Sequence, residues 1–246
     1  MRKLVATLAC RANGSRLYGK PLQMLDIERG TTVIEHMVHL LRTAPEIADI
    51  VLAVSHGAEN EPFHRIAAQL GIRAIRGDER DVLQRLILAG RAAQATDVFR
   101  VTSESPFTYL DPLPEVWRRH VERGNDLTVI DGVPEGTHFE VYTLEALERS
   151  HARGTERHRS ELCSLYIREH RDQFSIDIVD VPDCVRRLDL RLTIDYPEDL
   201  VLCRRVYARL RDTAPRLALP DIVRMLDEEP AWRALVEAYV VPTPLY

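Results

Sequence analysis

The sequence predicts an α/β fold built around a mostly parallel sheet. In the first half of the chain, apolar segments of strand length alternate with segments of helical periodicity, which is typical of strand–helix–strand units. The first apolar segment runs directly into a loop rich in glycine and basic residues, as found where open α/β sheets bind phosphorylated ligands. With 246 residues, 45% of them hydrophobic, the chain can build a full core.

The elements of the first half follow in chain order. Four apolar segments are expected to form strands: Leu4–Ala9, Ile50–Ser55, Arg73–Ile75 and Val98–Thr102. Three segments between them carry apolar residues at helical spacing and are expected to form helices: Thr32–Arg42, Glu61–Leu70 and Val82–Gln94. A further helix is expected at Leu113–Arg123, because Asp111 and Pro112 suit a helix N-terminus.

The pattern changes after residue 124. Residues 125–187 are interpreted as a small α+β insertion into a nucleotide-binding domain formed by residues 1–124 and 188–246. The insertion is expected to hold strands at Leu127–Ile130, Phe139–Tyr142 and Ile176–Val181, and helices at Leu144–Arg153 and Glu156–Arg171. Leu188–Ile194 alternates apolar and polar residues, which predicts a strand that rejoins the main sheet. The pattern from Glu198 onward is helical, with breaks at three prolines: Pro215, Pro220 and Pro230.

Composition limits the classes of function. The net charge of −5 and the pI near 6.0 argue against a general nucleic-acid binder, although a local basic site can still bind one small anion. The chain has no run of about 18 apolar residues and no signal-peptide pattern at its start, so we expect a cytoplasmic protein without membrane contact. Its four cysteines form no CxxC pair, which argues against a disulfide framework and a structural zinc site.

The loop from Gly14 to Lys20 fits the first seven positions of the Walker A pattern GxxxxGK. Pro21 stands where that pattern needs a Ser or Thr hydroxyl for Mg²⁺, and its ring removes a backbone N–H donor. The loop therefore predicts phosphate binding without the chemistry of a P-loop NTPase.

Four sequence blocks occur in order along the chain: Arg11–Lys20 (RANGSRLYGK), Gly77–Arg85 (GDERDVLQR), Ser103–Pro106 (SESP) and Thr193–Leu200 (TIDYPEDL). Together they resemble the cytidylyltransferases that make nucleotide-activated sugars, such as the CMP-Kdo and CMP-sialate synthetases. The branch that they resemble most is named after a spore-coat polysaccharide protein.

The resemblance implies a Rossmann-like three-layer α/β/α fold of the nucleotide-diphospho-sugar transferase, or GT-A, type. It also implies a Mg²⁺-dependent enzyme that transfers CMP from CTP to a sugar acid or related anionic acceptor and releases pyrophosphate. Insertions of this kind pair subunits in the relatives, so a homodimer is expected.

Three basic residues of the first loop, Arg11, Arg16 and Lys20, are the expected catalytic residues. They can neutralise a triphosphate and stabilise the charge that develops as pyrophosphate leaves. Ser55 ends a predicted strand at the same sheet edge, where it can meet the base or ribose. The expected nucleotide-binding residues are Ala9, Cys10, Arg11, Gly14, Ser15, Lys20, Ser55 and Ser103.

Glu104 and Asp195 match positions at which the resembling family carries metal-binding aspartates, so the resemblance implies that they bind Mg²⁺. Glu104 is one methylene longer than the usual Asp, which requires the metal to sit farther back or to be bound differently. Asp195 also has a structural interpretation, because Asp195 and Glu198 suit a capping arrangement at the start of the next helix. The two roles of Asp195 can coexist.

His138, Glu140 and Glu161 are the expected acceptor-binding residues. The segment PEGTHFEVY at 134–142 resembles the family's acceptor-facing segment, with His138 in place of an Asp. A histidine there either contacts an acidic acceptor or serves as a structural hydrogen-bond partner. Glu161 lies in a segment that matches the family only loosely.

Two other functions stay open. One is a guanylyl- or uridylyltransferase that acts on a sugar phosphate, because base choice depends on a few loop contacts. The other is a nucleotide-binding homologue that has lost catalysis, because Glu104 and His138 both depart from the family pattern.

Overall fold

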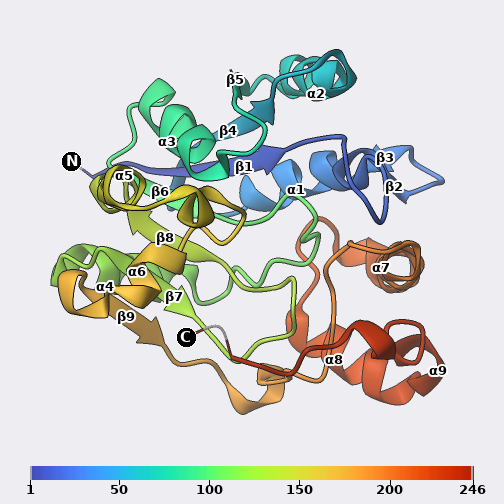
Figure 1. Ribbon diagram of the computed structural model, residues 1–246. Coiled ribbons are helices and arrows are strands. Elements are labelled where there is room, and N and C mark those ends of the chain that lie inside the picture. Colours follow the sequence, from blue (N-terminus) through green and yellow to red (C-terminus); the bar gives the residue numbers. More distant parts are fainter. Residues whose placement is uncertain (1, 245) are drawn as a thin grey trace.

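The computed structural model describes residues 2–244 and 246, and a seven-stranded sheet forms its centre (Figure 1). The strand order is β5-β4-β1-β6-β8-β7-β9. Neighbours pair in parallel except at β8, which is antiparallel to both β6 and β7. The strands are β1 (Leu4–Cys10), β4 (Ile47–Ser55), β5 (Arg73–Gly77), β6 (Asp97–Arg100), β7 (Leu127–Ile130), β8 (Glu140–Thr143) and β9 (Ile176–Val179). The predicted mostly parallel sheet is confirmed.

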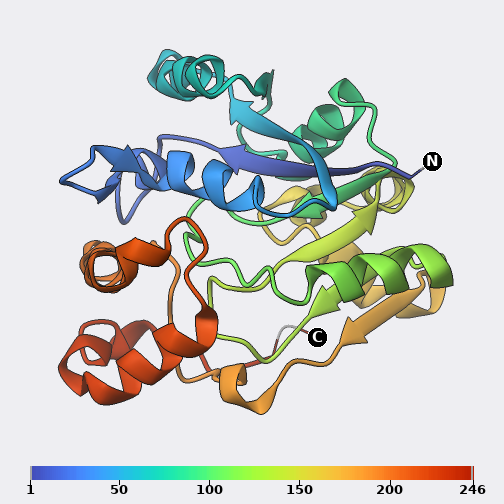
Figure 2. The same ribbon diagram turned by 180° about the vertical axis from the view of Figure 1, so that it is seen from behind.

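Helices cover both faces of the sheet, which gives the expected α/β/α layers (Figure 2). Leu4, Ala6 and Leu8 of β1 enter one core and Val5 enters the other, because successive side chains of a strand point to opposite faces. The helices are α1 (Val33–Leu41), α2 (Glu61–Leu70), α3 (Val82–Ala92), α4 (Leu113–Arg123), α5 (Leu144–Arg153), α6 (Leu165–Glu169), α7 (Pro197–Leu210), α8 (Leu219–Glu228) and α9 (Pro230–Arg233). The first core takes residues from α1, α2, α4, α7 and α8, and the second from α3, α5 and α6.

Two expectations about individual elements are wrong, and one small element was not predicted. Leu188–Ile194 joins no sheet: it begins with a turn at Leu188 and Asp189, and only Arg191 forms an isolated bridge, with Glu135. Leu192 N–H donates to the carbonyl of Glu135, and Ile194 N–H to that of Glu104. The single helix expected at Glu156–Arg171 is replaced by a 3₁₀ turn, the short helix α6 and a second 3₁₀ turn that begins at residue 171. A small hairpin of β2 (Met24–Asp26) and β3 (Thr31–Thr32) was not predicted.

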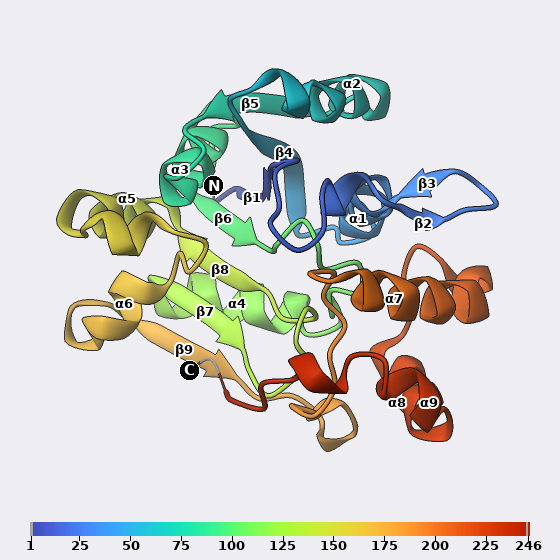
Figure 3. The same cartoon turned by 45° about the vertical axis from the view of Figure 1, so that its right-hand side comes forward.

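Residues 125–187 contribute β7, β8 and β9 to the same sheet as β1, so the segment extends the main architecture. Its boundaries as an insertion remain a prediction. Figure 3 shows α7, α8 and α9 grouped on the opposite side of the sheet from α5 and α6. Within the described residues, we find no helix with the length and apolar character needed to cross a membrane.

Candidate active site

A pocket opens at the carboxyl ends of β1 and β6, where the first loop meets the segment after β6. The carboxyl edge of a parallel sheet is where open α/β folds bind ligands. The structure brings nine predicted site residues into its lining: Ala9, Arg11, Gly14, Ser15, Arg16, Lys20, Ser103, Glu104 and Glu161. These residues come from distant parts of the chain, so the fold itself assembles the site.

Backbone geometry explains the two glycines of the first loop. Gly19 has a φ of 58°, in the left-handed region, and its N–H donates to the carbonyl of Ala12 at 2.7 Å, which closes the loop. A Cβ on Gly14 would lie 2.5 Å from the carbonyl oxygen of Leu17. Lys20 and Pro21 then open a single 3₁₀ turn, where the missing N–H of Pro21 costs no hydrogen bond. The loop thus directs Lys20 into the pocket.

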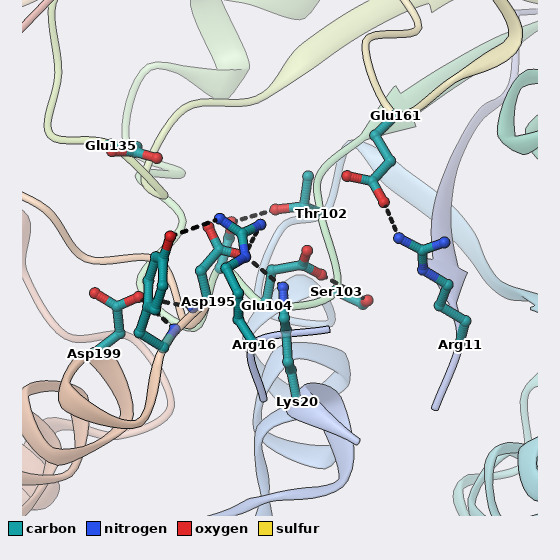
Figure 4. A network of polar contacts seen from close by, with 12 residues as sticks. Arg11, Arg16, Lys20, Thr102, Ser103, Glu104, Glu135, Glu161, Asp195 and Asp199 are labelled. Atoms are coloured by element: carbon teal, nitrogen blue, oxygen red, sulfur yellow. Dashed lines mark hydrogen bonds and ion pairs between the residues drawn. The ribbon is translucent and has the colours of Figure 1, made fainter. Parts of the chain in front are cut away.

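Asp195 is the carboxylate on which the basic residues of the loop converge (Figure 4). Its Oδ1 lies 2.5 Å from Lys20 Nζ and 3.5 Å from Arg16 Nη2, and its Oδ2 lies 3.0 Å from Arg191 Nη2. Burial acts to raise the pKa of Asp195, but the hydrogen bond from Lys20 and the three positive charges outweigh it and hold the pKa below its usual value. Asp195 is therefore ionised at neutral pH.

Asp195 does not cap α7, so the predicted capping arrangement with Glu198 is wrong. Asp199 takes this role: its carboxylate accepts the backbone N–H groups of Asp195 and Tyr196 at 2.8 and 2.9 Å. Arg191 holds Asp199 in place through two hydrogen bonds of 2.8 and 3.0 Å. Because Asp199 satisfies the helix end, the side chain of Asp195 is directed at the first loop.

Glu104 lines the pocket and lies beside this cluster (Figure 4). Burial raises its pKa, Asp195 raises it further by like-charge repulsion, and Lys20 acts in the opposite direction. Ser103 Oγ lies 3.0 Å from the Glu104 carboxylate and 2.8 Å from the carbonyl oxygen of Ala9. Two neighbouring carboxylates, both half-buried, form a site that a cation would stabilise.

Residues 2–244 and 246 contain no group of three or more side chains with metal-binding geometry. Glu104 and Asp195 alone can still fit a hard cation such as Mg²⁺, which keeps several waters and takes further oxygen ligands from a substrate phosphate. The two carboxylates therefore suit a metal that arrives with a nucleotide.

The third basic residue of the loop, Arg11, stands on the other side of the pocket and pairs with Glu161 (Figure 4). Arg100, at the end of β6, donates to the backbone carbonyl of Glu161 at 2.8 Å and to the carboxylate of Glu140 at 3.0 Å. Arg100 thus connects the pocket wall to the segment expected to bind the acceptor.

Five predicted residues do not line the pocket: Cys10, Ser55, His138, Glu140 and Asp195, the last of which contacts the lining residues Lys20 and Arg16. The Cys10 thiol points into the core, and burial raises its pKa to about 12. Ser55 is buried, and its hydroxyl has no hydrogen-bond partner among the described residues. Burial lowers the pKa of His138, so the imidazole is neutral at neutral pH, and Glu140 binds Arg100 and the Tyr246 hydroxyl. Their ligand roles remain predictions.

The pocket also contains Arg85, the last residue of the block Gly77–Arg85, for which a contact to the nucleotide or acceptor and a purely structural role are both open from the sequence. Arg85 is 1% exposed and lines the pocket from α3. A signal for it existed in the sequence, because Arg85 falls among Val82, Leu83 and Leu86 on the buried face of a predicted helix. A charged residue in that position is unusual unless it serves a ligand or is paired.

Comparisons with known proteins identify the family. The family model "Cytidylyltransferase" matches residues 6–214. The Bacillus subtilis spore coat polysaccharide biosynthesis protein SpsF is 26% identical over 232 residues, covering 94% of this chain and 96% of SpsF. An uncharacterized protein of Methanocaldococcus jannaschii is 25% identical over 200 residues, covering 81% of each chain.

Solved structures share the fold. A cytidylyltransferase from Leptospira borgpetersenii superposes with a TM-score of 0.84 at 18% identity, covering 94% of this chain and 97% of its own. CMP:2-keto-3-deoxy-manno-octonic acid synthetase, solved with CTP, has a TM-score of 0.65 at 14% identity, covering 84% of this chain and 99% of its own. The family match, together with a basic loop and two carboxylates at one sheet edge, shows that the chain belongs to the cytidylyltransferase family.

Proposed function

We propose that this protein transfers CMP from CTP to an anionic, sugar-like acceptor and releases pyrophosphate. The convergence of Lys20 and Arg16 on Asp195, next to the half-buried Glu104, carries the proposal. Membership in the cytidylyltransferase family supports CTP as the donor. The name of the Bacillus relative and the sugar-acid substrate named for the synthetase structure support an acceptor of this class.

The basic residues would act by exchanging partners. Lys20 and Arg16 are held by Asp195 in the structure, so a triphosphate can replace that carboxylate without moving the loop far. Once bound, Lys20, Arg16 and Arg11 would stabilise the negative charge on the departing pyrophosphate. The acceptor oxygen would attack the α-phosphorus in line with that leaving group.

Mg²⁺ is part of the proposal because of the two carboxylates. Asp195, released from Lys20, and Glu104 would hold the ion, which would supply charge neutralisation at the phosphate oxygens. Burial raises the pKa of Glu104, so protons compete with the metal for this carboxylate. The Mg²⁺ requirement should therefore rise as the pH falls.

Glu104→Asp tests this role. The shorter side chain restores the residue that the resembling family uses, and we expect the Mg²⁺ concentration for half-maximal activity to fall about threefold. Pyrophosphate release is measured against Mg²⁺ concentration, with Glu122→Asp on the exposed face of α4 as control. Unchanged activity and an unchanged Mg²⁺ requirement would show that Glu104 does not bind the metal.

The acceptor would enter on the side of Arg11 and Glu161. Arg100 binds the backbone carbonyl of Glu161 and the carboxylate of Glu140, and the neutral His138 lies on the same segment as Glu140. These side chains would offer both donors and acceptors of hydrogen bonds to a polyhydroxy acid. A homodimer, in which residues 125–187 pair two subunits, completes the proposal.

Nucleotide binding tests the function without knowledge of the acceptor. In the presence of Mg²⁺, CTP at about 100 times the Kd of CTP should raise the unfolding temperature by several degrees, whereas GTP should leave it nearly unchanged. A shift with GTP alone would overturn the cytidylyl assignment. Pyrophosphate release with a set of sugar acids, including 2-keto-3-deoxy-manno-octonic acid, then tests transfer itself.

A further inference from the structure

Arg85 is a buried cation without a counter-ion. Its side chain is 1% exposed, and it forms no ion pair with any carboxylate in the described part of the chain. Its Nη1 donates to the carbonyl of Cys10 at 3.3 Å, and its Nε has no partner among the described residues. A buried charge in this state destabilises the folded protein unless something compensates it. The expected compensation is a ligand, because Arg85 lines the pocket.

The block Gly77–Arg85 is built to hold this side chain. A Cβ on Gly77 would lie 2.6 Å from Cγ of Arg85, so the glycine makes room for the arginine stem. Asp81 caps α3 by accepting the N–H of Gln84 at 2.8 Å, which fixes where the helix begins and hence where Arg85 points. The end of β5, the Asp81 cap and helix α3 together place the guanidinium of Arg85 against the carbonyl of Cys10.

The surroundings of Arg85 favour a nucleotide base over a phosphate. Ala9, Val82 and Leu86 line the same pocket, and apolar side chains suit a flat ring better than a hydrated phosphate. Lys20 and Arg16 already provide a phosphate-binding group, and they are engaged with Asp195. Burial lowers the pKa of Arg85, which fits a dry position.

We propose that Arg85 is the residue that distinguishes cytosine from uracil. Cytosine presents two adjacent acceptors, O2 and N3, which match the parallel donors of a guanidinium, whereas N3 of uracil carries a hydrogen. UTP would therefore leave a buried donor facing a donor, a mismatch that costs about tenfold or more in affinity. This inference depends on the proposed function, because it requires a nucleoside triphosphate in the pocket.

Arg85→Met tests the inference by removing the donors while keeping the length of the side chain. Affinities for CTP, UTP and inorganic tripolyphosphate are measured by calorimetry with Mg²⁺. The wild type should prefer CTP over UTP about tenfold or more, and the variant should reduce this ratio to about threefold or less with tripolyphosphate affinity unchanged. Without ligand, the variant should unfold at a higher temperature, because it loses an uncompensated buried charge.

Two further variants secure the result. Gly77→Ala displaces Arg85 but keeps its charge, and it should lower the CTP preference in the same way, which covers the case in which Arg85→Met does not fold. Arg91→Met, on the same helix but paired with Glu148 at the surface, should leave the preference intact. An unchanged ratio in both test variants, or equal losses for all three ligands, would overturn the role of Arg85 as a base reader. A wild type that binds none of the ligands would overturn the proposed function itself.

Discussion

Lys20→Ala is expected to lower the kcat of CMP transfer about 10³-fold while the protein stays folded. The Nζ atom of Lys20 lies 2.5 Å from Asp195 in the pocket, where it would meet the triphosphate. No other lysine can replace it, since Lys3 is the only other lysine of the chain. Asp195 keeps Arg16 and Arg191 as partners in the variant, so the fold should survive.

The measurement is Mg²⁺-dependent pyrophosphate release, with CTP affinity and thermal unfolding recorded on the same samples. Lys3→Ala is the matched control: Lys3 precedes β1 at the far end of the strand, and its Nζ donates to the carbonyl of Ala93. Lys20→Arg keeps the positive charge but replaces the compact ammonium group by a larger, planar guanidinium group. We therefore expect partial activity. Wild-type turnover in Lys20→Ala would contradict the catalytic role.

Elements whose signals are local could be predicted from the sequence. The helices Glu61–Leu70 and Leu113–Arg123 have the expected bounds, because a proline near each start and a glycine after each end mark them. The strand Leu127–Ile130 also has its expected bounds, since its four residues are all buried and of strand-forming type.

Elements whose structure depends on distant partners could not be predicted. Leu188–Ile194 alternates like a strand because Leu190, Leu192 and Ile194 are buried, but its hydrogen bonds go to loops after β6 and β7. The charged segment 156–171 lacks an apolar stripe long enough for a single helix. It breaks where Arg100 binds the backbone carbonyl of Glu161 and where His158 pairs with Glu169.

The site shows the same division. The loop cations are neighbours in sequence, so their common location could be predicted. Their counter-ions could not, because the pairs Lys20–Asp195 and Arg11–Glu161 join residues 175 and 150 positions apart. Arg85 shows a further limit: the sequence leaves a ligand contact and a structural role open, and only the structure shows that this buried charge has no carboxylate partner among the described residues.

Asp195→Asn is expected to lower kcat by about 10²- to 10³-fold, through the metal and not through the fold. The amide keeps the size of the side chain, and its single oxygen can still accept from either Lys20 or Arg191, but it is a poor Mg²⁺ ligand. Much of the lost activity should not return at high Mg²⁺, since Glu104 alone would hold the ion. Activity is measured as pyrophosphate release over a Mg²⁺ titration.

The pH dependence of stability separates a metal role from a structural one. Because the pKa of Asp195 is lowered in the folded protein, its carboxylate stabilises the fold at pH values above the ordinary pKa of an aspartate. This contribution is lost as the pH falls through the lowered pKa. The unfolding temperature of Asp195→Asn should therefore lie slightly below that of the wild type at neutral pH. At strongly acidic pH the two unfolding temperatures should be equal. Asp189→Asn, which loses a surface carboxylate paired with Arg187 and Arg233, should match the small change in stability without a loss of activity. Equal activity of the two variants would contradict the metal-binding role of Asp195. A carboxylate that only balances the charge of neighbouring basic residues can be replaced without loss of activity, whereas a carboxylate that holds the metal cannot.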